Sequence, residues 1–140
     1  MGKVQILAVL TIDGCHSSEL YYKAHQDLCL DRCGLDEIRK NALYRVTPDY
    51  SISMLHEWRK DGTNIRYLAE ATPDTADYIN GLLRMHAVDE IILYTVPFIS
   101  GSGRHFFKSA LPEQHWTLSS LKSFPNGVCR IIYILDKKAR

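Results

Sequence analysis

Residues 4–14, with the sequence VQILAVLTIDG, form a nearly continuous apolar run that closes with Asp13-Gly14. A run of this kind, rich in β-branched residues, is typical of a strand that is buried on both faces of a sheet. We therefore expect a central strand here, followed by a turn at the Asp-Gly pair.

Two later segments have a similar composition. The segment NIRYLA at residues 64–69 is a short strand candidate, and DEIILYTVPFI at residues 89–99 has two apolar faces. The segment between them has the signals of a helix start: Thr72 as the cap, Pro73 at the first helical position, and Asp74 where the helix dipole favours negative charge. This strand, helix, strand unit predicts two parallel strands with a right-handed crossover.

The remaining segments complete an α/β pattern. Helical spacing runs from Ser18 to Gly34, a second short helix is predicted over residues 35–43, and a third over residues 51–62. Near the end, WTLSSLKSF and VCRIIYILD are joined by Pro125-Asn126-Gly127, a strong hairpin signal. We predict a mixed, mainly parallel sheet flanked by helices, with a C-terminal antiparallel hairpin.

Length and composition narrow the class of protein. A chain of 140 residues suits one domain spanning residues 1–140, and a net charge of +1 supplies no field that attracts nucleic acid or an acidic membrane. No segment approaches the roughly 20 apolar residues of a membrane span. The four cysteines are scattered along the chain and do not have the spacing of a disulfide framework. We therefore expect a cytoplasmic protein. The six histidines contain no HxH or HxxxH pair, so we predict no metal site.

Three motifs, taken in their order along the chain, are specific enough to compare with a known protein family. They are Thr11-Ile12-Asp13-Gly14, Ala87-Val88-Asp89-Glu90, and Pro97 followed by Gly101, Gly103 and Phe106 or Phe107. This arrangement resembles the dihydrofolate-reductase-like family, and within it the reductase domain of the bifunctional riboflavin-biosynthesis enzyme. The resemblance covers the first strand and the chain from about residue 51 onward, whereas residues 15–50 match poorly.

The resemblance implies an NADPH-dependent reductase that acts on a pyrimidine or pteridine-type heterocycle, and it implies a homodimer. It places Asp13 as the catalytic residue, at the carboxyl end of the first strand where such sheets open into a cleft. We expect partial burial there to raise the pKa of Asp13. Further contacts implied are Thr11, Gly14 and His16 to the substrate, and Thr72, Gly101, Ser102, Gly103 and Arg104 to the cofactor.

Two departures from the family pattern affect the NADPH site. Glu70-Ala71 stands where members have a glycine pair that receives phosphate, and a close contact between a carboxylate and a phosphate is repulsive by roughly 1 kcal/mol even in water. No Gly-Arg-x-Thr element occurs in residues 15–60, so we expect the strand that carries it to be missing. These departures favour an alternative function: a non-catalytic dimeric relative with a ligand-binding or structural role.

Each candidate also has a simpler interpretation. Asp13-Gly14 is a common strand-to-helix turn, and residues 101–105 can be a turn with a basic tail instead of an anion site. Glu70 can stabilise the dipole of the following helix. Cys15 and His16 could be a nucleophile and its base, but adjacent residues rarely face one another.

Overall fold

The structure, a computed structural model, describes residues 2–17, 33–60, 64–101 and 104–136. It contains one six-stranded sheet with the strand order β2-β3-β1-β4-β6-β5. The strands are β1 (Lys3–Leu10), β2 (Tyr44–Arg45), β3 (Arg66–Glu70), β4 (Glu90–Thr95), β5 (Trp116–Ser123) and β6 (Cys129–Leu135). The helices are α2 (Leu35–Asn41), α3 (Ile52–Lys60) and α4 (Ala76–Arg84).

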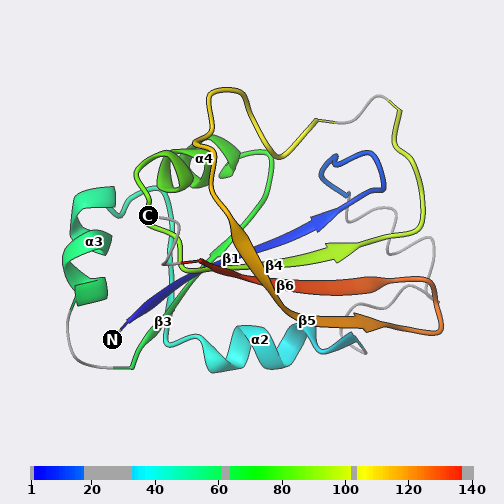
Figure 1. The fold of residues 1–140 in the computed structure, drawn as a ribbon, viewed down its shortest axis with the longest axis horizontal. Helices are drawn as coiled ribbons and strands as arrows, with labels where there is room; N and C mark the ends of the chain where they lie inside the picture. The colour runs from blue at the N-terminus through cyan, green and yellow to red at the C-terminus, as the bar shows by residue number, and fades with distance from the viewer. Residues whose placement is uncertain (1, 18–32, 61–63, 102–103, 137–140) are drawn as a thin grey trace.

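Strand β1 lies in the middle of the sheet and pairs in parallel with β3 on one side and β4 on the other. The predicted parallel arrangement of β3 and β4 is therefore confirmed, with β1 between them. Strand β6 runs antiparallel to β4, and β5 pairs with β6 through the predicted hairpin. The mixed, mainly parallel sheet with a C-terminal hairpin is confirmed (Figure 1).

Alternate residues of β1 enter two separate cores, as a strand with two buried faces requires. Val4, Ile6 and Ala8 pack with α3 and α4, and Leu7 packs with α2 on the opposite face. Figure 1 shows α4 and α2 on opposite sides of the sheet. The described helices therefore cover both faces of β1.

The Asp89 side chain fixes the start of β1 to the start of β4. Its carboxylate accepts the N–H of Val4 at 2.9 Å, and the guanidinium of Arg59 lies 3.7 Å away. Arg59 is buried on α3 and also donates to the carbonyl of His86. The Val-Asp-Glu motif identified in the sequence thus joins two strands and a helix.

Two boundaries differ from the sequence-based expectation. Helix α4 begins at Ala76 instead of Pro73, because Thr72 and Thr75 form a hydrogen-bonded turn before it. A short strand that the sequence did not indicate, β2, follows α2 and pairs with β3 in parallel. It has only two residues and no Gly-Arg-x-Thr sequence. The helix expected from Ser18 falls almost wholly outside the described residues.

None of the helices in the described ranges has the length and apolar character needed to cross a membrane.

The central position of β1 leads to a stability prediction. Ile6 is 0% exposed, so Ile6→Ala removes buried methyl groups and leaves a cavity, which should lower the free energy of unfolding by about 2–5 kcal/mol. Ile134→Ala, at a β6 residue that is 39% exposed, should lower it by about 1 kcal/mol or less. Urea denaturation of both variants measures this difference, and equal losses would contradict the assignment of β1 to the core.

Candidate functional site

The chain makes a compact turn directly after β1. The N–H of Thr11 donates to the carbonyl of Cys15 at 2.9 Å, and the N–H of Cys15 donates to the Thr11 hydroxyl at 3.0 Å. Gly14 completes the turn with φ of +80°, a left-handed conformation that side chains other than glycine rarely adopt. The turn places the Asp13 carboxylate at the carboxyl edge of the sheet.

Asp13 connects this turn to the loop that follows β4. Its carboxylate accepts the N–H of Ser100 at 3.1 Å and the N–H of Gly101 at 3.0 Å. The hydroxyl of Thr11 donates to the same carboxylate. A further bond, from the N–H of Ile12 to the carbonyl of Phe98 at 2.9 Å, holds the two segments together. Asp13 therefore acts as a cross-link between two loops.

These donors determine the charge state of Asp13. The hydrogen bonds from Thr11, Gly101 and Ser100 hold the pKa of Asp13 well below its ordinary value, because they stabilise the ionised form. The expectation of a pKa raised by burial was wrong, since three donors outweigh desolvation. A carboxylate that stays ionised at neutral pH is a poor proton donor to a heterocycle nitrogen.

The segment after the loop returns to the same edge. The N–H of His16 donates to the carbonyl of Arg104 at 2.8 Å, and the N–H of Phe106 donates to the carbonyl of Gly14 at 3.2 Å. Asn80, fully buried on α4, donates to the carbonyl of Phe106 at 2.8 Å and accepts the N–H of Lys108 at 3.0 Å. Asn80 thus anchors this segment to the helix.

Two polar atoms at this edge are buried and have no partner among the described residues: Nε2 of His16 and Oγ of Ser17. The His16 ring stands edge-on against Phe106, with the ring centres 5.6 Å apart. Burial lowers the pKa of His16, and the positive charges of Lys108 and Arg104 lower it further. A neutral imidazole nitrogen and a hydroxyl are thus available to bind a polar group.

The imidazole that faces Cys15 belongs to His105, not to His16. The Cys15 Sγ atom lies 4.0 Å from Nδ1 of His105, and the two residues form an isolated β-bridge. The thiol is only 1% exposed, although His105 is exposed. The pairing of Cys15 with His16 as nucleophile and base is therefore not seen. No group of three or more His, Cys, Asp or Glu side chains within the described segments could hold a metal.

The turn between β3 and α4 is where the resemblance implies cofactor phosphate. The Glu70 carboxylate there accepts from Nε of Arg39 at 2.6 Å and from a guanidinium nitrogen of Arg45 at 3.0 Å. Glu70 thus ties β3 to α2 and β2. Both arginines were missed in the sequence, because nothing local links them to Glu70.

Three backbone donors of this turn are already used. The N–H of Ala71 donates to the carbonyl of Leu7 at 2.8 Å, and the N–H of Thr72 donates to the Thr75 hydroxyl at 2.8 Å. The N–H of Thr75 bonds to Thr72 through both its carbonyl and its hydroxyl, and Pro73 has no N–H. The turn therefore presents few of the free donors that a phosphate site requires.

The structure brings together six of the residues singled out in the sequence. Hydrogen bonds join Thr11, Asp13, Gly14, His16, Gly101 and Arg104 into one cluster of loops, directly or through a shared turn. Among the described residues, Thr72 has no hydrogen bond to that cluster and bonds to Thr75 instead. Ser102 and Gly103 lie outside the described residues. Asn80 was missed, and so was the contact of His105 with Cys15. The signal for Asn80 is a polar residue within the apolar stripe of α4.

Comparison with known proteins identifies the fold through solved structures, but it finds no match by sequence. No family model matches the chain, and no curated protein matches it by sequence. Among solved structures, a protein from Shewanella sp. PV-4 described as a riboflavin biosynthesis protein superposes with a TM-score of 0.64 at 10% identity, covering 96% of this chain and 99% of that one.

Two further structures agree with this result. RibD of Acinetobacter baumannii matches with a TM-score of 0.61 at 12% identity over 98% of this chain, which spans 59% of the length of RibD. Dihydrofolate reductase of Enterococcus faecalis, solved with NADP(H), matches with a TM-score of 0.58 at 11% identity over 96% of this chain and 97% of that one. The protein has a dihydrofolate-reductase-like fold, as the sequence motifs predicted.

The role of Asp13 as a cross-link predicts a pH dependence. A carboxyl group whose pKa is lowered by folding stabilises the protein above its unfolded pKa of about 3.9, and this stability is lost as the pH falls toward the folded value. Asp13→Asn should therefore melt at a lower temperature than the unchanged protein at pH 7, and the gap should narrow below about pH 4.

Differential scanning calorimetry across this pH range measures the gap. Asp49→Asn, at an exposed position, is the control and should leave the melting temperature nearly unchanged. A gap between Asp13→Asn and the unchanged protein that stays constant from pH 7 to pH 3 would contradict this account.

Proposed function

We propose that this protein is a ligand-binding relative of the dihydrofolate-reductase-like reductases, one that binds a pyrimidine or pteridine-type heterocycle without transferring hydride from NADPH. The observation that carries the proposal is the turn between β3 and α4, where Glu70 and the bonded N–H groups of Ala71 and Thr72 replace an open phosphate site.

A phosphate needs free N–H donors and positive charge at the start of a helix. Binding at this turn would break the bonds of Thr72 and Thr75, and it would bring the phosphate toward the Glu70 carboxylate. The Glu70 carboxylate pairs with both Arg39 and Arg45, so it offsets one of their two positive charges and engages donors that a phosphate would use. The bonded N–H groups and the Glu70 carboxylate oppose NADPH at this turn, and they favour a protein that does not use it.

The proposed heterocycle site lies at the carboxyl edge of β1. Nε2 of His16 and Oγ of Ser17 are buried there with no partner in the described part of the chain, which favours a ligand that satisfies them. A heterocycle with ring nitrogens and carbonyl groups supplies the matching polar atoms. Asp13 serves this site by holding the loop of Ser100 and Gly101 in place.

NADPH-dependent reduction is the second candidate, and the fold favours it. The Enterococcus faecalis reductase that superposes on this chain was solved with NADP(H). For this chain to act in the same way, a different set of residues would have to hold the phosphates. Arg104, at the edge of the loop cluster, is the cationic residue placed for that role.

A titration with NADPH separates the two candidates. We expect the dissociation constant to be weaker than about 100 µM, because the Glu70 carboxylate and the bonded N–H groups of Ala71 and Thr72 disfavour a phosphate beside α4. Glu70→Gly/Ala71→Gly should tighten binding at least about tenfold, since it removes the carboxylate and frees Arg39 and Arg45 for a phosphate.

Isothermal titration calorimetry measures both constants. Glu113→Gly, which removes an exposed carboxylate elsewhere, controls for the change in net charge and should leave the weak binding unaltered. A dissociation constant in the low micromolar range for the unchanged protein would reject the proposal in favour of the reductase.

We also propose a homodimer formed over β5. This strand is at the edge of the sheet, and it carries two exposed leucines, Leu118 at 52% and Leu121 at 64%. The strand register places both on the face that carries Ile131 and Tyr133 of β6. An edge strand with exposed apolar side chains is a surface that proteins commonly cover.

Sedimentation velocity at micromolar concentrations tests the dimer. We expect a mass about twice the 16.0 kDa of one chain, and we expect Leu118→Lys/Leu121→Lys to return it to the monomer, because two charges at the interface repel their symmetry copies. Circular dichroism should show an unchanged fold in that variant. A mass near 16.0 kDa for the unchanged protein would contradict the dimer.

A further inference from the structure

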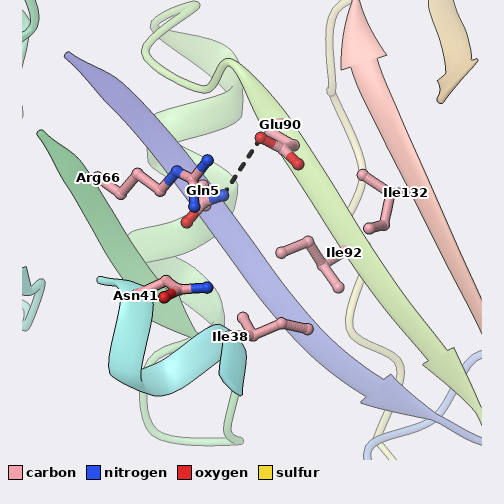
Figure 2. A pocket seen from close by; sticks show the side chains of 7 residues that line it. All are labelled: Gln5, Ile38, Asn41, Arg66, Glu90, Ile92 and Ile132. Carbon is pink, nitrogen blue, oxygen red and sulfur yellow. Dashed lines mark hydrogen bonds between the residues drawn. The ribbon is translucent and has the colours of Figure 1, made fainter. Parts of the chain in front are cut away.

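A cavity of about 140 Å³ lies at the opposite edge of the sheet from the site described above. Its lining comes from four strands and from α2 (Figure 2): Gln5, Ile38, Asn41, Arg66, Glu90, Ile92 and Ile132. Arg66 and Glu90 are the first residues of β3 and β4, so the cavity opens near the amino ends of the parallel strands. It is therefore independent of the proposed heterocycle site.

The polar part of the lining carries two opposite charges that do not meet. Glu90 accepts from the Gln5 amide at 3.2 Å, as Figure 2 shows, and this leaves its other oxygen open. Neither the Arg66 guanidinium nor the Asn41 amide bonds to another side chain in the part of the chain that is described. Arg66 and Asn41 are exposed, so the cavity communicates with solvent beside them.

The position of Gln5 makes the polar lining unusual. Gln5 is only 6% exposed and lies on the middle strand, where its neighbours in sequence are apolar core residues. Its amide nitrogen is bonded to Glu90, but its amide oxygen makes no bond within the described residues. Gln5 lines the cavity, and an amide oxygen that faces a cavity can accept a hydrogen bond from a ligand that donates one.

The other part of the lining is an apolar wall. Ile92 is 2% exposed, and Ile38 and Ile132 are partly buried beside it. A ligand that places an aliphatic group against this wall gains binding free energy, because apolar surface is removed from water. The cavity thus has three parts: an anionic part at Glu90 and Gln5, a cationic part at Arg66, and an aliphatic part at the three isoleucines.

We propose that this cavity binds a small zwitterion, a free α-amino acid with a short branched aliphatic side chain. Its ammonium group would lie between Glu90 and the Gln5 amide oxygen, and its carboxylate would lie at Arg66 and the Asn41 amide nitrogen. Its side chain would pack on Ile38, Ile92 and Ile132.

The size of the cavity agrees with such a ligand. A closed cavity of about 150 Å³ holds a six-atom ring, so about 140 Å³ with an open side suits a ligand of roughly six to eight non-hydrogen atoms. Valine has a frame of this size. Small ligands of this class bind weakly, and we expect a dissociation constant of about 0.1–3 mM.

Calorimetric titration with L-valine tests the site. Isobutylamine and isobutyrate each keep the aliphatic group and one charge, and each should bind at least about tenfold more weakly than L-valine, because one charged contact is lost. Glu90→Gln and Arg66→Gln should each weaken L-valine by about tenfold or more. Glutamine at position 90 can still accept from Gln5, so the apo fold should persist.

Glu113→Gln, at an exposed position away from the cavity, is the matched control and should leave L-valine binding unchanged. Binding that is undetectable up to about 10 mM L-valine would overturn the proposal. Equal binding of isobutylamine or isobutyrate would overturn it as well, because a single charge would then suffice. So would unchanged L-valine binding in Arg66→Gln, whose substituted side chain is exposed and not needed for folding.

Discussion

The parallel pairing of β1 with both β3 and β4 is the constraint on which the rest of the structure depends. It uses the hydrogen-bonding groups on both edges of β1, and it brings the carboxyl ends of three strands to one edge of the sheet. The side chains of β1 must then be apolar on both faces, and Ile6 and Leu7 fill the two cores. The edges of the sheet that carry the two proposed sites follow from this arrangement.

The same edge can serve different chemistry, depending on how its backbone donors are used. In this protein the carboxylates of Asp13 and Glu70 take up donors from other segments: the N–H groups of Ser100 and Gly101, and the guanidinium groups of Arg39 and Arg45. Each bond stabilises a loop and removes a donor that a ligand could use. In the proposed function the fold is kept while the phosphate site is weakened, and a shared fold does not by itself imply a shared activity.

The sequence predicted the sheet well because its signals are local and periodic. The apolar runs around residues 4–10 and 89–96, and the Pro125-Asn126-Gly127 turn, each define an element without reference to the rest of the chain. The start of α4 was placed three residues early, because the mutual bonds of Thr72 and Thr75 compete with the helix.

The site was less predictable, because its contacts join residues that are far apart in the sequence. The pKa of Asp13 depends on the nearby hydroxyl of Thr11 and also on donors 87 and 88 residues away. Glu70 meets Arg39 and Arg45 through pairing that no local pattern indicates. Strand β2 has two residues, too few for a period to be visible. Asn80 could have been recognised as unusual within an apolar helix face, but its partners at Phe106 and Lys108 could not.

The central claim is that the turn before α4 does not receive a phosphate. The most direct measurement is a titration of ¹⁵N-labelled protein with NADPH, followed by NMR at the backbone amides of Ala71, Thr72, Thr75 and Ala76. The account predicts that these four signals stay in place while any weak shifts fall elsewhere, since the N–H groups of Ala71, Thr72 and Thr75 are bonded within the protein. Saturable shifts that are largest at Thr72, Thr75 and Ala76 would contradict it.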